Sequence, residues 1–361
     1  MSERKRYSHI DLLETLAIFF VLIYHCTLYS YDFAAEGTAV NYLRYFSRTI
    51  LSTCVPLFFF ANGYLLFHRP FQMKKHIRRT LRIVILVIIW GFLLVPIYMS
   101  IAGEPISVKE TVRAILNMDT KWAMNHFWFF CTLVSIYILF PALKTLFDKD
   151  RRSLWLIAAA CFVFTFGFVL VNEMLALGSV LTHRWLGTIN YFFIVTLSPF
   201  RGQFDYALVY FCAGGLICTY EDQILAIPAG KRNTLSILGI LISCGLLFAT
   251  GILYTGMGDE LWDVVWNGYD TVFTLCNVIF LFILSLNYSK DFWIIREISC
   301  NTLGIFFTHE TILRLTRSAL RAVPALCNVP ISVLYSFTVL CVCLAICLLL
   351  RRIPVLKRLV C

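Results

Sequence analysis

Apolar residues occur in long runs along this chain, and polar residues gather in the short segments between them. A helix needs about 20 apolar residues to cross the hydrocarbon core of a bilayer. The pattern predicts ten such helices, at about 9–30, 49–67, 81–101, 126–147, 153–173, 204–220, 235–255, 269–287, 300–318 and 330–350. It also predicts a short interfacial helix over 106–117 and a long loop over 174–203. We therefore expect an all-α membrane bundle of about ten helices, forming a single domain over residues 1–361.

The composition supports this interpretation. Hydrophobic residues make up 60% of the 361 residues and charged residues 14%, and the mean hydropathy is +0.78. Soluble domains average about 45–50% apolar and about 25% charged residues. The 14 cysteines are spread through apolar segments without a CxxC motif, which is typical of small core residues and indicates neither a disulfide framework nor a metal site.

The formal net charge of +10 comes from short basic clusters at the ends of the predicted helices. This placement favours orientation in a membrane, with lipid headgroups as contacts, over binding to nucleic acid. If the N-terminus is inside, the predicted cytoplasmic segments hold 21 of the 31 Lys and Arg residues. The distribution predicts that both termini are cytoplasmic.

His25 lies within the first apolar run. An ionisable imidazole is costly to bury at membrane depth, so it indicates catalysis or proton transfer. The alternative is an interfacial histidine whose ring is satisfied by a neighbouring carbonyl. Counting 1.5 Å per residue places His25 in the outer half of the membrane, His126 at its outer face and His309 near the midplane. The three histidines can therefore share one cavity.

Arg79 and Arg82 form an RxxR motif at the inner mouth of the third predicted helix, and Arg78 adds a further basic side chain. Residues three apart share a helix face, and guanidinium groups bind phosphate in a bidentate manner. We expect Arg82 to be partly buried, because an apolar run follows it directly. The alternative is that these residues are topology markers that contact anionic lipid headgroups.

Two further polar positions lie within predicted helices. Asn62 offers hydrogen-bonding groups inside the bundle, and Gly63 beside it permits close approach of another helix. Glu14 lies about three turns from His25 on nearly the same face, so it could orient His25 only through an intermediary. The alternative is that Glu14 is a partner for an Arg of a neighbouring helix.

These motifs, in this order, resemble the acyltransferase family 3 membrane proteins. The resemblance covers nearly the whole chain and rests on five blocks: Ile10-Asp11…His25, Val55-Pro56…Gly63-Tyr64, Arg79…Arg82, His126-Phe127-Trp128…Tyr137…Pro141 and Thr302-Leu303-Gly304…His309. It implies a multi-pass enzyme of the bacterial cytoplasmic membrane. Such enzymes move an acyl group, commonly acetyl, from a cytoplasmic donor such as acetyl-CoA to envelope glycans.

The chain departs from the family pattern at several positions. Glu14 stands where the family usually has Arg or Lys, and Asn62 where it often has Ser. Phe306 stands where it often has Tyr, and Glu310 where Pro often follows the histidine. The reversed charge at Glu14 leaves two alternatives open: a divergent subgroup with another donor or acceptor, and a non-catalytic relative.

The resemblance implies roles for the candidate residues. The CoA phosphates of an acyl-CoA donor are expected near Arg78, Arg79 and Arg82. His25 would act as general base on a glycan hydroxyl, or would carry the acyl group covalently. His126, His309 or Asn62 would stabilise the oxyanion.

A transporter or flippase of a glycan or lipid precursor is the rival hypothesis. The buried polar groups would then line a path, and His25 would relay protons. The ordered blocks and the lack of an evident internal repeat disfavour this hypothesis.

Overall fold

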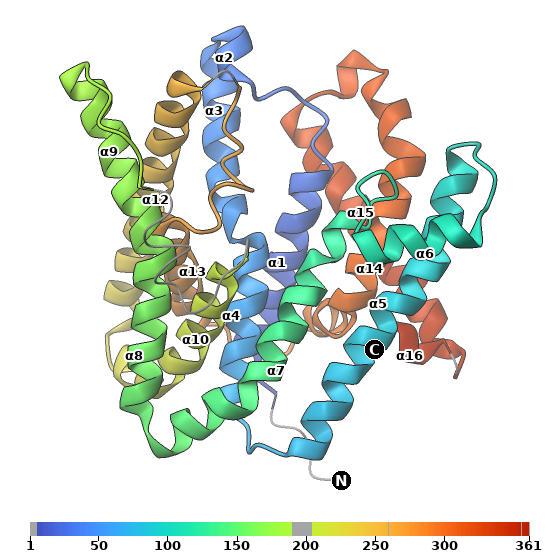
Figure 1. Cartoon of the computed structure of the whole chain (residues 1–361), viewed down its shortest axis with the longest axis horizontal. Coiled ribbons are helices and arrows are strands. Elements are labelled where there is room, and N and C mark those ends of the chain that lie inside the picture. The colour runs from blue at the N-terminus through green and yellow to red at the C-terminus, as the bar shows by residue number, and fades with distance from the viewer. Residues whose placement is uncertain (1–5, 190–203, 259, 355, 361) are drawn as a thin grey trace. The chain divides into compact units, whose positions relative to one another are not determined.

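The computed structural model describes residues 6–189, 204–258, 260–354 and 356–360 (Figure 1). It is 80% helical, and these residues contain no strand, which confirms the predicted helical membrane fold. The chain divides into two compact units, one of residues 1–24, 30–69 and 150–299 and one of residues 25–29, 70–149 and 300–361.

Seven stretches of the described residues are long and apolar enough to cross a membrane: Ser8–His25, Ala39–Phe67, Met73–Ile101, Asn125–Lys149, Arg151–Thr182, Ala229–Met257 and Val329–Arg352. Each corresponds to one of the ten predicted helices. The other three predicted spans are also helical. Two of them, α10 (Tyr206–Ile217) and α13 (Val272–Ser285), have only 12 and 14 residues. The third, α14 (Trp293–Arg321), is long but carries several charges. The count of ten and the orientation of the termini stay predictions.

The described part of the first unit contains α1 (Ser8–His25) except its last residue, nine further complete helices, and the first turns of α14. The nine are α2 (Phe33–Glu36), α3 (Ala39–Arg48), α4 (Cys54–Phe67), α8 (Arg151–Phe162), α9 (Phe168–Thr182), α10, α11 (Glu221–Leu225), α12 (Ala229–Met257) and α13. A π-helical turn over Val163–Gly167 joins α8 to α9. Helix α9 continues to Thr182, so the predicted loop is wrong over 174–182, where apolar residues simply extend the helix. Residues 190–203 of that loop lie outside the described residues.

Helices α4 and α10 cross at two glycines. A Cβ atom built on Gly63 would lie 1.9 Å from the carbonyl oxygen of Phe211, and one on Gly214 would lie 2.0 Å from that of Phe60. Both helices are buried almost all round, since their sequences are apolar on every face. The expected close approach at Gly63 is confirmed.

We predict that Gly63→Ala destabilises the protein by roughly 1–3 kcal/mol, because the added methyl group meets backbone that cannot rotate away. Thermal unfolding in detergent measures the effect. Gly245→Ala is the matched control: Gly245 lies in α12, and a Cβ there has no neighbour within 4 Å. The control should be neutral or slightly stabilising, because alanine has the higher helix propensity. Equal melting temperatures for the two variants would contradict the prediction.

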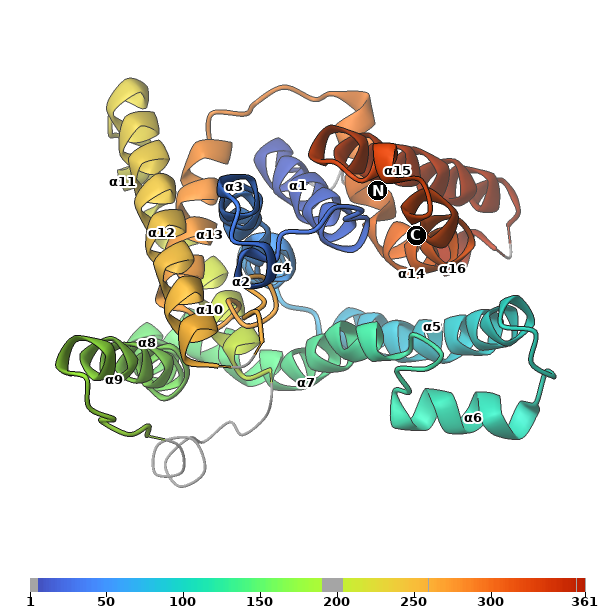
Figure 2. The ribbon, with the colours of Figure 1, turned by 90° about the horizontal axis from the view of Figure 1, so that it is seen from above.

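The second unit contains α5 (Met73–Ile101), α6 (Val108–Asn117), α7 (Trp128–Lys149), α15 (Val329–Arg352), α16 (Lys357–Val360) and the part of α14 from Cys300 on. Helix α6 corresponds to the predicted short helix. It begins at the Ser107 cap, whose hydroxyl accepts from the Glu110 amide, and ends at Met118 in the left-handed conformation. It lies beside α5 (Figure 2).

Helix α16 is held against three longer helices of the same unit. The indole of Trp90 on α5 donates to the carbonyl of Leu359, and the two atoms are 3.1 Å apart. Val360 is buried against Gly304 of α14, where a Cβ atom would lie 3.0 Å from the Val360 side chain. Helix α16 also packs against α15. These contacts bring the end of the described chain next to α5 and α14.

Candidate active site

Three histidines from three different elements lie together in the second unit. His25 ends α1, His126 belongs to a short 3-10 turn (Asn125–Phe127) before α7, and His309 lies on α14. The ring of His309 is 5.4 Å from that of His25 and 5.9 Å from that of His126, measured between centroids. The expected convergence of the three histidines is confirmed. Their chemical roles stay predictions.

His309 is the central ring of this group and is 1% exposed. Its Nδ1 lies 2.6 Å from the carbonyl oxygen of Phe306, one turn earlier on α14. A carbonyl can only accept a hydrogen bond, so Nδ1 must carry the proton. In the neutral ring, Nε2 therefore presents its lone pair. This fixed tautomer makes His309 an acceptor for a proton or a hydrogen bond.

The segment before α7 holds two buried polar atoms without a hydrogen-bond partner. They are Nε2 of His126 and Nε1 of Trp122. Ala123 between them has a φ of 53°, in the left-handed region that alanine rarely adopts. Unsatisfied buried groups and backbone strain both cluster at functional sites. The segment thus presents two polar groups that a substrate could satisfy.

Aromatic rings surround the histidines on the α14 side. Phe306 lies 5.8 Å from His126 and 5.6 Å from His309, and Phe307 stacks on Trp90 of α5 at 5.1 Å. Phe127 and Phe130 complete this wall against Phe307. Because these rings are nearly all buried, they exclude water and strengthen electrostatic interactions at the imidazoles.

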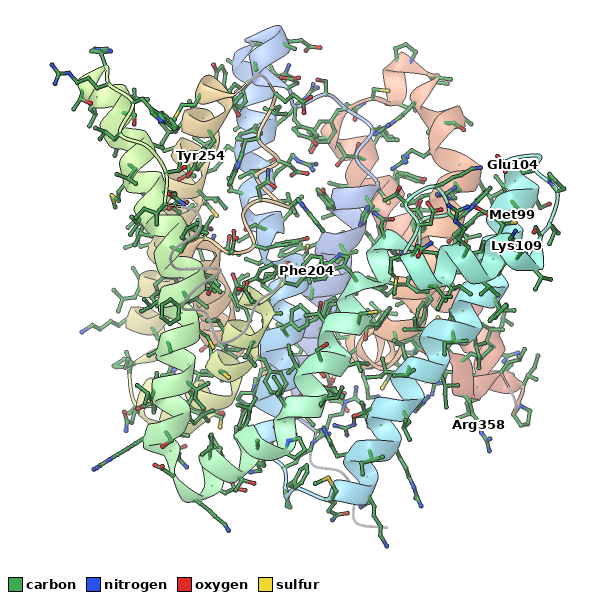
Figure 3. The ribbon with its side chains drawn as sticks, viewed as in Figure 1. Met99, Glu104, Lys109, Phe204, Tyr254 and Arg358 are labelled. Atoms are coloured by element: carbon green, nitrogen blue, oxygen red, sulfur yellow. The ribbon has the colours of Figure 1, made fainter. Side chains whose placement is uncertain are left out.

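The arginines of the RxxR motif lie near the start of α5, in the same unit. Arg79 is half-buried, whereas Arg78 and Arg82 are exposed. The expected partial burial of Arg82 is wrong: the apolar residues that follow it are themselves largely exposed on this face of α5. The guanidinium of Arg82 donates to the carbonyl of Arg358 on α16, with the atoms 3.2 Å apart. Arg358 is labelled in Figure 3.

The structure also gives the spacing between the arginines and the histidines. Trp90 and Tyr98 of α5 reach α14 on either side of His309, at Phe307 and at the hydroxyl of Thr311. Trp90 lies about 12 Å and Tyr98 about 24 Å beyond Arg82 along the helix axis, at 1.5 Å per residue. A ligand bound by Arg82 must therefore be long and linear to reach the histidines.

Five basic residues of this unit were not among the site residues predicted from the sequence. Lys357 and Arg358 are exposed on α16, which Arg82 contacts. Arg314, Arg317 and Arg321 follow His309 on α14, and Arg317 donates to the carbonyl oxygen of His25 itself, at 3.3 Å. The spacing of three and four residues between Arg314, Arg317 and Arg321 is visible in the sequence. The hydrogen bonds of Arg317 to His25 and of Arg321 to Thr27 are not, since they join residues that lie 292 and 294 positions apart.

Asn62 and Glu14 belong to the first unit. The Asn62 amide donates to the carbonyl of Phe58 in its own helix, at 2.9 Å. Its role as an oxyanion donor stays a prediction. Glu14 accepts from the hydroxyl of Ser299, which also donates to Asp11. Arg6 pairs with Asp11, which shares the Ser299 hydroxyl with Glu14.

The described residues include no group of three His, Cys, Asp or Glu side chains arranged to hold a metal ion. A family model described as an acyltransferase domain matches residues 7–352. The match spans both units and includes all three histidines and the RxxR motif. No curated protein and no solved structure matches the chain.

Proposed function

The chain belongs to this acyltransferase family, and we propose that it moves an acyl group, acetyl in the first instance, from cytoplasmic acyl-CoA to a hydroxyl of an extracytoplasmic envelope glycan. The family match makes the protein a membrane acyltransferase rather than a transporter. Donor, acceptor and the bacterial cytoplasmic membrane as location are parts of the proposal.

The donor would bind with its nucleotide phosphates at Arg78, Arg79 and Arg82. Guanidinium groups suit phosphate because they offer paired donors and keep their charge. Lys357 and Arg358 add positive charge beside Arg82. The pantetheine arm of CoA would then follow α5 and carry the thioester toward the histidines. The extended pantetheine arm can span the distance along α5 from Arg82 to the points where Trp90 and Tyr98 contact α14.

The chemistry would be a direct transfer with a histidine as general base. His25 takes the proton of the acceptor hydroxyl as its oxygen attacks the thioester carbonyl. Nε2 of His309 accepts a hydrogen bond and supports the positive charge that develops on this ring. His126 donates to the tetrahedral oxyanion from Nε2, which is buried without another partner and must carry a proton to do so. Collapse of the intermediate expels the CoA thiolate, which takes the proton from His25.

The convergence of His25, His126 and His309 carries the proposal. Three imidazoles at membrane depth are costly, and proton transfer during acyl transfer is a use that repays that cost. Phosphate-binding residues at the far end of α5 supply the second requirement of a CoA-dependent enzyme.

Release of CoA from acetyl-, succinyl- and longer acyl-CoA by the purified protein in lipid tests the proposal. We expect slow hydrolysis of one donor and faster release when an envelope polysaccharide is added, with the acyl group recovered as an ester. A folded protein that releases no CoA from any of these donors, with or without acceptor, would contradict it.

A further inference from the structure

Helix α14 carries a row of three arginines directly after the central histidine. Arg314, Arg317 and Arg321 follow His309 by 5, 8 and 12 residues. Spacings of three and four residues place their side chains on one face of the helix. The row rises about 8, 12 and 18 Å above His309 along the helix axis. We call these residues the arginine row.

The arginines of the row contact His25 or residues close to His25 and His309. Arg314 lies over the ring of Tyr98, 4.6 Å from its centroid, and bonds to Glu310 at 3.3 Å. Arg317 donates to the carbonyl of His25, and Arg321 donates to the carbonyl of Thr27 at 2.8 Å. These last two bonds cap the end of α1, where carbonyl groups lack partners within the helix.

The row carries more positive charge than its surroundings balance. Among the described residues, Glu310 is the carboxylate that pairs with the row, and it pairs with Arg314. Arg317 and Arg321 donate to backbone carbonyls only. A guanidinium has five N–H groups, so most donors of these two side chains are left for another ligand. Arg317 is half-buried and Arg321 is exposed, so a soluble molecule can reach them in turn.

Membrane topology does not account for these charges. If the N-terminus is cytoplasmic, the row lies at the outer end of α14 and includes three of the ten Lys and Arg residues in the outer segments. Topology signals place Lys and Arg on the cytoplasmic side. Orientation in the membrane therefore does not explain why three arginines lie at the predicted outer end of α14, beside His25 and His309.

We propose that the arginine row binds the negatively charged groups of the acceptor, so that the acceptor is an acidic glycan bearing carboxylate or phosphate groups. The row would guide such a chain from the outer face down to His309, with a hydroxyl of the sugar delivered at His25. Guanidinium groups bind carboxylate and phosphate through paired, charge-assisted hydrogen bonds. This inference rests on the proposed function, because it specifies the acceptor of that reaction.

Equilibrium binding to the purified protein in zwitterionic lipid nanodiscs tests the inference without need for turnover. The probes are a short oligoglucoside and the same oligosaccharide oxidised to the carboxylate at C6. We expect the oxidised form to bind the wild type about 10-fold more tightly, as one or two charge-assisted bonds imply. Calorimetric titration measures both affinities.

Three variants distinguish the effect of the arginine row from that of positive charge elsewhere on the protein. Arg321→Gln leaves the hydrogen bond from Arg317 to His25 unchanged and should abolish the preference for the oxidised form. Arg113→Gln removes an exposed arginine on α6 and should leave the preference unchanged. Arg321→Lys keeps the charge but loses the paired donors, and should retain part of the preference.

Equal affinity for the two oligosaccharides, or a preference that survives in Arg321→Gln, would overturn the inference. So would a preference that vanishes in nanodiscs with anionic lipid, because the row would then hold lipid headgroups. The proposed function is tested separately, by the release of CoA from acyl-CoA. A protein that releases CoA but shows no preference refutes the acidic acceptor alone.

Discussion

Replacing His25 by alanine is expected to lower the rate of acyl transfer by roughly 10²–10⁴-fold, the usual contribution of a general base. His25 is the last residue of α1 and lies beside His309. Without its imidazole, the acceptor hydroxyl must lose its proton to water, which the aromatic wall of Phe306 and Phe307 keeps out. Initial rates with saturating acyl-CoA and acceptor measure the loss.

The fold should survive this substitution. The contact with Arg317 uses the backbone carbonyl of His25, which alanine keeps. The matched control is His183→Ala, which removes an exposed histidine at the end of α9 and should retain full activity. A stable His25→Ala variant with wild-type transfer would show that His25 is an ordinary interfacial residue.

Replacing Arg79 and Arg82 together by glutamine is expected to raise the KM for acyl-CoA about 100-fold, since each arginine supplies a charge-assisted bond to phosphate. The kcat should change little, because the arginines lie far along α5 from the histidines. Steady-state kinetics with acyl-pantetheine provides the sharper comparison. This donor lacks the nucleotide phosphates, so its KM should be the same in the variant and the wild type.

Arg152→Gln is the control for the donor experiment. Arg152 is an exposed arginine at the start of α8, in the first unit, and its loss should leave both KM values unchanged. A double variant with an unaltered KM for acyl-CoA would assign Arg79 and Arg82 to topology or lipid contact instead.

The convergence of the histidines was predictable from the sequence, because depth follows from counting residues along helices that the hydropathy pattern fixes. His25, His126 and His309 each lie in a separate apolar run, at predicted depths between the midplane and the outer face, so a bundle can bring them together. The close approach at Gly63 was predicted from the small size of glycine. Both features depend on residue type and position within single helices.

Other features depend on contacts between distant segments. Glu14 accepts a hydrogen bond from Ser299, which lies 285 residues further along the chain, so no local pattern pointed to this partner. The arginine row was not predicted as part of the site, because basic residues at helix ends were interpreted as topology signals. Arg82 was expected to be partly buried, because an apolar neighbour in sequence was taken for a packed neighbour in space.

The helix count shows where the pattern itself is ambiguous. Helices α10 and α13 are apolar throughout but only 12 and 14 residues long, so flanking turns were counted as helix. Helix α14 is long enough, but Glu310 and the arginine row make it more polar than a lipid-facing span. Apolar runs in sequence mark buried helices as readily as lipid-facing ones.

In the proposed reaction, the reactive end of the donor reaches the three histidines. An acyl-CoA with a photoreactive diazirine in its acyl chain tests this directly, with labelled peptides mapped by mass spectrometry. We expect labelling of residues near 122–130 and 305–310, suppressed by excess acetyl-CoA. Competable labelling confined to the first unit would contradict it.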